Sequence, residues 1–141
     1  MAAETGSWEE TFPPELDASR RARNGVEGLL RAAGVPERAV AAVLLVVSEL
    51  VANAIRHAGT DFTVTADLDG DVVRIQVLDQ DSRPPALLGF DTESTSGRGL
   101  QMVAGVSRDW GWRTAESDGG VSGKVVWAEV ETEGPVAPEV G

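Results

Sequence analysis

The sequence predicts an α+β fold, a two-layer sandwich of a mostly antiparallel sheet with helices on one face. Three observations favour this class. Apolar residues recur at helical spacing through residues 17–57, they alternate with polar residues in later segments, and those segments pair around glycine-containing turns. Consecutive antiparallel strands that follow helices argue against a doubly wound parallel sheet.

The size and composition fit one domain. The chain has 141 residues, of which 42% are hydrophobic and 25% charged, values that are ordinary for a soluble globular protein. We expect the domain to span residues 7–131. Residues 1–6 and 132–141 are mostly small or polar and contain glycine or proline, which is typical of disordered tails.

The N-terminal part is expected to form an edge strand and a helix. Residues 7–12 suit a strand that Pro13-Pro14 stops. Asp17 is placed to cap a helix over residues 17–33, and Gly34 suits the position just past its end.

A second helix is expected over residues 36–57, with Pro36 where its missing N–H costs nothing. This is a core helix, because its apolar residues form one broad stripe at helical spacing. The stripe consists of Val40, Val43, Leu44, Val47, Leu50, Val51 and Ala54. The longest apolar run, Ala39 to Val47, has nine residues and falls short of the roughly 20 that cross a bilayer.

Two hairpins are expected after the helices. Asp69-Gly70 is a strong signal for a two-residue turn, and Asp118-Gly119-Gly120 marks the second turn. The four strands are expected at residues 62–68, 73–77, 110–115 and 124–130.

Two elements lie between the hairpins. The first is the segment of residues 79–99, and the second is a short helix from about Arg98 to Arg108. The segment is rich in proline, serine, threonine and glycine and is too long for a plain connector. It is therefore a candidate functional loop.

Charge and residue usage exclude several classes of function. The net charge of −11 repels a phosphate backbone, so we expect no direct nucleic-acid binding, whereas a basic protein partner would be attracted. The absence of cysteine and the single histidine exclude disulfides, thiolate zinc sites and sites with several imidazoles. A hydrolase built on His57 with Ser48 or Asp79 lacks a nucleophile-elbow sequence. The first twenty residues contain no apolar leader, so we expect a cytoplasmic protein that binds no membrane.

The second helix carries a polar row beside its apolar stripe. Glu49 and Asn53 are four residues apart, so they share one face about 6 Å apart along the axis, and His57 continues the row. Taken alone, such a row is more often a solvated helix face.

Two further segments suit a nucleotide site. Asp79 closes an apolar strand with a carboxylate. Gly97 and Gly99 open the short helix, whose free N–H groups and dipole favour a phosphate.

Together these segments resemble the histidine kinase-like ATPase superfamily. Ser48–His57 (SELVANAIRH) is similar to its N box, Val77–Asp79 to the start of its first glycine box, and Gly97–Leu100 (GRGL) to its second. The short single domain, the glutamate within the N box and Gly123–Trp127 (GKVVW) resemble anti-sigma-factor serine/threonine kinases, particularly the small actinobacterial type. The resemblance covers residues from about Pro14 to Val130.

The resemblance implies ATP and Mg²⁺ as cofactors. Glu49 would be the catalytic residue, Asn53 would bind Mg²⁺, Asp79 would accept from the adenine amine, and Lys124 would reach the terminal phosphates. The glycines would let the backbone approach the phosphates. The full set expected around the nucleotide is Asn53, His57, Asp79, Gly97, Arg98, Gly99, Leu100 and Lys124.

Three functions stay open at this point. The resemblance implies a kinase that phosphorylates an anti-sigma-factor antagonist on Ser or Thr and otherwise holds a sigma factor, acting as a homodimer. The second is a nucleotide-dependent binding module without catalysis, and the third is an α+β scaffold without nucleotide.

The sequence departs from the family pattern after Asp79. The family continues Asp-x-Gly-x-Gly, whereas here Gln80, Asp81, Ser82 and Arg83 follow. We expect an altered adenine pocket, with the charge of Asp81 opposing phosphate. Residues 86–96 form a short segment without a basic residue, so we expect modest ATP affinity.

Overall fold

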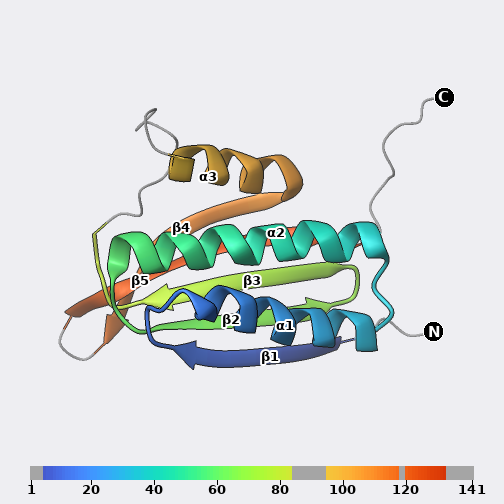
Figure 1. The fold of residues 1–141 in the computed structure, drawn as a ribbon, viewed down its shortest axis with the longest axis horizontal. Helices are drawn as coiled ribbons and strands as arrows, with labels where there is room; N and C mark the ends of the chain where they lie inside the picture. Colours follow the sequence, from blue (N-terminus) through green and yellow to red (C-terminus); the bar gives the residue numbers. More distant parts are fainter. Residues whose placement is uncertain (1–4, 84–94, 118–119, 133–141) are drawn as a thin grey trace.

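A computed structural model describes residues 5–83, 95–117 and 120–132. Its strands form one antiparallel sheet in the order β1-β2-β3-β5-β4, with the helices packed on one face (Figure 1). The predicted fold class is confirmed. The strands are β1 Thr5–Phe12, β2 Phe62–Asp69, β3 Val72–Asp79, β4 Asp109–Ser117 and β5 Gly120–Glu131.

Within the described residues, three α-helices and one π-helical turn make up the second layer. Helix α2 lies between α1 and α3 and packs against both (Figure 1). Helix α3 begins three residues earlier than predicted. The bounds are α1 Asp17–Ala32, α2 Glu37–Asn53, the π-helical turn η1 Ala54–Ala58 and α3 Thr95–Val106.

The ends of α1 differ in how well the sequence predicted them. Asp17 was expected to cap the helix, but it is the first helical residue, and Leu16 occupies the cap position without a side-chain hydrogen bond. Gly34 has φ +77°, the left-handed conformation expected just past a helix end.

The core lies between the sheet and α2. The predicted stripe of α2 is buried except Leu44, which is partly buried against the core, and Val46 joins it. In β2 and β3, Val64, Ile75 and Val77 alternate with more exposed neighbours and face the helices. The period-2 and period-3.6 patterns of the sequence therefore converge on one core.

Helix α2 and η1 together, Glu37–Ala58, are long and apolar enough to cross a membrane by length and composition, with a mean hydropathy of 1.9. Half of its most apolar 18-residue window is buried inside the fold. Since α2 lies between two helices and over the sheet, its apolar character is that of a core helix.

Both expected tails contribute ordered residues to the domain. Strand β1 begins at Thr5, inside the segment that was expected to be disordered. Thr132 is buried, and its backbone N–H donates to the Asp71 carbonyl at 2.8 Å.

Candidate functional site

The predicted site residues gather at one end of the helix layer. The C-terminal ends of α2 and β3 and the N-terminal end of α3 lie on the same side of the fold in Figure 1. The π-helical turn that continues α2 contacts β3. This end, with Asn53, Asp79 and Lys124, is called the polar end below.

Asn53 is the last residue of α2 and is 5% exposed. Its side-chain Oδ1 is buried without a hydrogen-bond partner among the described residues. The sequence had placed Asn53 on a polar edge of the helix. That expectation is wrong, because the side chain is buried with the apolar residues of the helix. A buried acceptor without a partner costs stability, and a bound ion is one explanation for such a group.

The helix changes its winding directly after Asn53. In η1 the Gly59 N–H donates to the Ala54 carbonyl five residues earlier, at 3.1 Å, and Gly59 has φ +66°. His57 lies within this wider turn, which directly follows the helix that carries Glu49 and Asn53. Single π-helical turns occur frequently at functional sites.

Asp79 and Lys124 form a buried ion pair. The Lys124 ammonium lies 3.1 Å from Asp79 Oδ1 and 3.0 Å from Oδ2, and the two side chains are only 3% and 2% exposed. It also donates to the Asp81 carbonyl at 3.1 Å. The pairing follows from the sheet, because Asp79 of β3 stands directly opposite Lys124 of β5.

This position of Lys124 differs from the one expected near terminal phosphates, since its ammonium lies at the residue expected to bind the base. The sequence carried one signal of the pair. Lys124 is the only lysine of the chain, and it opens the apolar run Val125-Val126-Trp127, where a solvated charge is out of place.

Close backbone packing holds this ion pair in place. A Cβ added to Gly123 would lie 2.0 Å from the Asp79 carbonyl oxygen, so only glycine fits there. The Asp81 N–H donates to Asp79 Oδ1 at 2.8 Å. Asp79 is thus fixed by its own turn and by the neighbouring strand.

The charge of Asp81 is compensated. The Arg83 guanidinium donates to both carboxylate oxygens of Asp81 and holds the pKa of that carboxyl well below its usual range. Arg83 also donates to the His57 carbonyl at 3.3 Å, which joins the end of η1 to the segment after β3. The expected opposition of Asp81 to phosphate is therefore weakened by its neighbour.

The second glycine segment lies within α3. Gly97, Arg98, Gly99 and Leu100 occupy its first two turns, because the helix begins at Thr95. Of the predicted functional loop, residues 84–94 lie outside the described residues, and with them most of the 86–96 segment.

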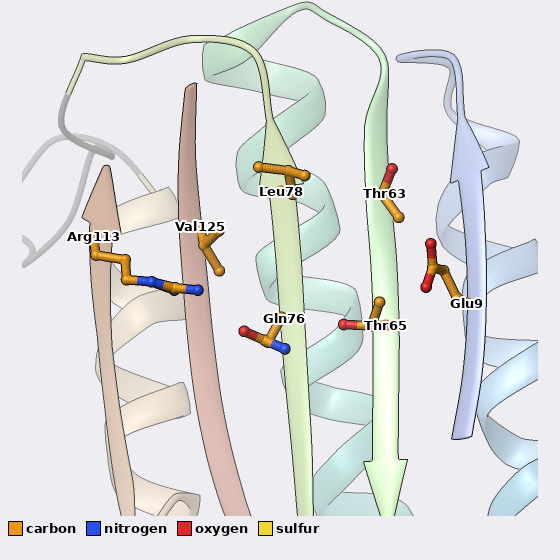
Figure 2. Close-up of a pocket in the computed structure, with 7 residues that line it drawn as sticks. All are labelled: Glu9, Thr63, Thr65, Gln76, Leu78, Arg113 and Val125. Carbon is orange, nitrogen blue, oxygen red and sulfur yellow. The ribbon is translucent and has the colours of Figure 1, made fainter. Parts of the chain in front are cut away.

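A hollow of about 230 Å³ lies on the other face of the sheet. Figure 2 shows its lining side chains on the face turned away from the helices. They are Glu9, Thr63, Thr65, Gln76, Leu78, Arg113 and Val125. None of the predicted site residues lines it, so the polar end is the stronger candidate.

Among the described residues, no group of three or more His, Asp or Glu side chains could hold a metal ion by itself. The unpaired Oδ1 of Asn53 nevertheless fits Mg²⁺, which prefers oxygen ligands and binds proteins through few of them when nucleotide phosphates and water supply the rest.

Comparison with known proteins shows the family of the chain. The sequence profile of the histidine kinase-like ATPase domain matches residues 12–129. The chain belongs to this family. The match includes Glu49, Asn53, Asp79 and Lys124.

A solved structure has a similar fold. The crystal structure of the RsbU and RsbW domains of Rv1364c from Mycobacterium tuberculosis is similar with a TM-score of 0.66 and 20% sequence identity. The match covers 92% of this chain and 33% of that one, so the chain spans about a third of the length of its relative. No curated protein sequence matches the chain.

Proposed function

We propose that the chain binds ATP with Mg²⁺ at the polar end and regulates transcription in the cytoplasm as a serine/threonine kinase of the anti-sigma-factor type. One observation carries this proposal. In a chain of the histidine kinase-like ATPase family, Asn53 at the end of α2 holds a buried side-chain oxygen that has no partner among the described residues. A bound cation would supply that partner.

The chain's own groups divide the work of binding. Asn53 would hold the cation through Oδ1, and Asp79 would accept a hydrogen bond from the adenine amine. The first turn of α3, which includes Gly97, offers backbone N–H groups that suit a phosphate, and Gly99 follows at the start of the second turn. When bound, Mg²⁺ would neutralise charge on the transferred phosphate.

Glu49 is the proposed catalytic residue. It lies one turn before Asn53 on α2 and is partly buried, so its carboxylate can orient a substrate hydroxyl near the bound nucleotide. Phosphoryl transfer depends mainly on positioning and charge neutralisation, so an ordinary carboxylate suffices for this role.

The partners are proposed from the resemblance of the motifs and from charge. An antagonist protein would present the accepting Ser or Thr, a sigma factor would be held in the alternative state, and the chain would act as a homodimer. The net charge of −11 favours a basic partner such as a factor that itself binds DNA.

A second function is a nucleotide-dependent binding module without phosphoryl transfer. Two observations favour it: the sequence after Asp79 lacks the two family glycines, and the carboxylate of Asp79 is already paired with Lys124. Both features should lower the affinity for the base. Neither of them concerns the surface that would bind a protein partner.

Titration calorimetry with ATP and GTP, with and without Mg²⁺, tests the nucleotide site. We expect Mg-dependent ATP binding with discrimination against GTP, lost in Asn53→Ala and retained in Asn24→Ala, an exposed asparagine of α1. Equal affinity for ATP and GTP, or no binding of either, would contradict the site.

Radiolabelled ATP with candidate antagonist proteins separates the two functions. As a kinase, the native protein labels an antagonist, Glu49→Ala binds ATP without labelling it, and Glu15→Ala, an exposed glutamate, behaves as native. Binding of ATP and a partner without any labelling would leave the binding module.

A further inference from the structure

The only lysine of the chain is buried against the carboxylate that is expected to bind adenine. We propose that Lys124 determines base specificity together with Asp79, by donating a hydrogen bond to ring nitrogen N1 of adenine. The inference rests on the proposed ATP site and adds a second protein group that contacts the base.

The burial of Lys124 is unusual for its residue type. Lysine is almost never fully buried unless it is paired, and here the side chain is 3% exposed. An apolar pair of similar size often packs at no cost in stability, so a buried ion pair is weak evidence for a stabilising role. The surrounding backbone is shaped to keep the pair, since Gly123 lies too close to Asp79 to carry a Cβ.

The pair offers one donor and one acceptor side by side. Asp79 Oδ1 accepts two hydrogen bonds from described groups, Lys124 Nζ and the Asp81 N–H, whereas its Oδ2 is in ion-pair contact with the Lys124 ammonium at 3.0 Å. A carboxylate oxygen has room for two, so Oδ2 can accept one more. The site therefore keeps acceptor capacity while the ion pair stays intact.

The ammonium can donate to a base without leaving the carboxylate. It has three hydrogens and three oxygens within 3.1 Å, of which two belong to Asp79 and one to the Asp81 carbonyl. If one of the two contacts with Asp79 turns to a ring nitrogen, the other maintains the ion pair.

Adenine matches this arrangement of groups. Its N6 amine is a donor and the adjacent N1 is an acceptor, which complements the free acceptor of Asp79 and the donor of Lys124. Guanine carries an acceptor at O6 and a donor at N1, so in the same orientation it would set donor against donor and acceptor against acceptor. Lys124 thus adds a second mismatched contact against guanine.

The native protein tests this with one analogue. In 1-deaza-ATP a C–H replaces N1 and the N6 amine is kept. We expect roughly ten- to a hundredfold weaker binding than ATP by calorimetry, the effect of losing a hydrogen bond from a charged donor. Equal binding of the two would overturn the role of Lys124 and leave the ATP site standing, whereas no binding of either would overturn both.

The single lysine allows a direct readout. Protein labelled with ¹⁵N at lysine Nζ has one such side-chain resonance. We expect ATP to shift this resonance and 1-deaza-ATP to leave it closer to its position in the free protein. A resonance that ATP does not move would overturn the proposal even if calorimetry shows a preference, because a bound water would then contact N1.

Lys124→Met removes the donor at similar length. We expect the variant to bind ATP and 1-deaza-ATP equally, while Arg113→Met, which removes a positive charge from the exposed face of the sheet, keeps the native preference. A preference that persists in folded Lys124→Met would overturn the proposal. If that variant does not fold, the two measurements on the native protein decide.

Discussion

The polar side chains near the two ends of α2 differ in their exposure to solvent. At its start, Arg31 of α1 pairs with Glu27 and with Glu37, the first residue of α2. These side chains are 35–73% exposed, and their hydrogen bonds raise the pKa of Arg31 and lower that of Glu37. At its end, Asn53, Asp79 and Lys124 are at most 5% exposed.

The stability of the fold explains the charged groups at the start of α2, but it does not explain the buried groups of the polar end. Exposed ion pairs at the start of α2 stay solvated, so they contribute little to stability and have little desolvation cost. At the polar end, desolvation is costly and one acceptor is left unpaired among the described groups. Natural sequences carry such local costs mainly at functional sites, which agrees with a nucleotide site at this end.

Removal of one charge from each end gives the largest expected contrast. Lys124→Met leaves the Asp79 carboxylate buried without its partner, which typically costs about 3–5 kcal/mol of unfolding free energy. Arg31→Met at the start should lose only a small fraction of that, because its carboxylate partners remain solvated.

Urea denaturation followed by circular dichroism measures both variants. The double variant with Asp79→Asn should recover much of the stability that Lys124→Met loses, since no buried charge remains. If Lys124→Met and Arg31→Met lose the same unfolding free energy, burial of the ion pair does not affect the cost of removing its charge.

Glycine substitutions give the next largest contrast. In Gly123→Ala the new Cβ would lie 2.0 Å from the Asp79 carbonyl oxygen, so the strands must shift, at a cost of about 1–3 kcal/mol or more. In Gly28→Ala, in the exposed face of α1, the Cβ meets nothing within 4 Å, so the helix should gain about 0.5–1 kcal/mol.

Thermal unfolding measures both glycine variants. We expect a lower unfolding temperature than that of the native protein for Gly123→Ala and a higher one for Gly28→Ala. Gly123→Ala should also alter the resonance of the Lys124 ammonium, because the ion pair lies directly beside the shifted backbone. If Gly123→Ala is as stable as the native protein, β5 can move away from the Asp79 carbonyl without loss of stability, which would contradict this prediction.

The sequence predicted those features that local spacing encodes. The apolar stripe of α2, the alternation in β2 and β3 and the turn at Gly70, which has φ +66°, depend on residues within a few positions of one another. The family motifs also predicted which segments form the polar end, because their order along the chain is distinctive.

The features that the sequence missed depend on distant segments. The pair of Asp79 with Lys124 joins residues 45 positions apart, through a strand order in which β5 lies between β3 and β4. Burial of Asn53 likewise depends on the tertiary packing around the end of α2, which local spacing does not encode. The π-helical turn at Ala54–Ala58 has no residue pattern that sets it apart from the α-helix before it.

Asn53→Ala should separate stability from binding. The change removes a buried acceptor without a partner among the described groups and leaves a small cavity, so the two effects offset and the unfolding free energy should change by about 1 kcal/mol or less. Mg-dependent nucleotide binding should nevertheless be lost. A large loss of stability would indicate that Asn53 is structural and that its oxygen is satisfied in solution.

The smallest expected effect comes from Asp81→Asn, which tests whether burial or location sets the contrast. Asp81 lies beside the polar end and its side chain is 11% exposed, but its partner Arg83 is 75% exposed, so breaking this pair should cost much less than breaking the buried pair of Asp79 and Lys124. Arg83 lowers the pKa of Asp81 below the value near 3.9 of an unfolded chain. A carboxyl whose pKa is lower in the folded state stabilises the fold above the unfolded pKa and loses this contribution as the pH falls through the folded one. The small difference in unfolding free energy between native protein and variant should therefore stay constant from about pH 5 to 8 and shrink only below about pH 4. Urea denaturation at several pH values measures it. A large difference at neutral pH would mean that the polar end as a whole, and not burial alone, makes its charges costly to remove.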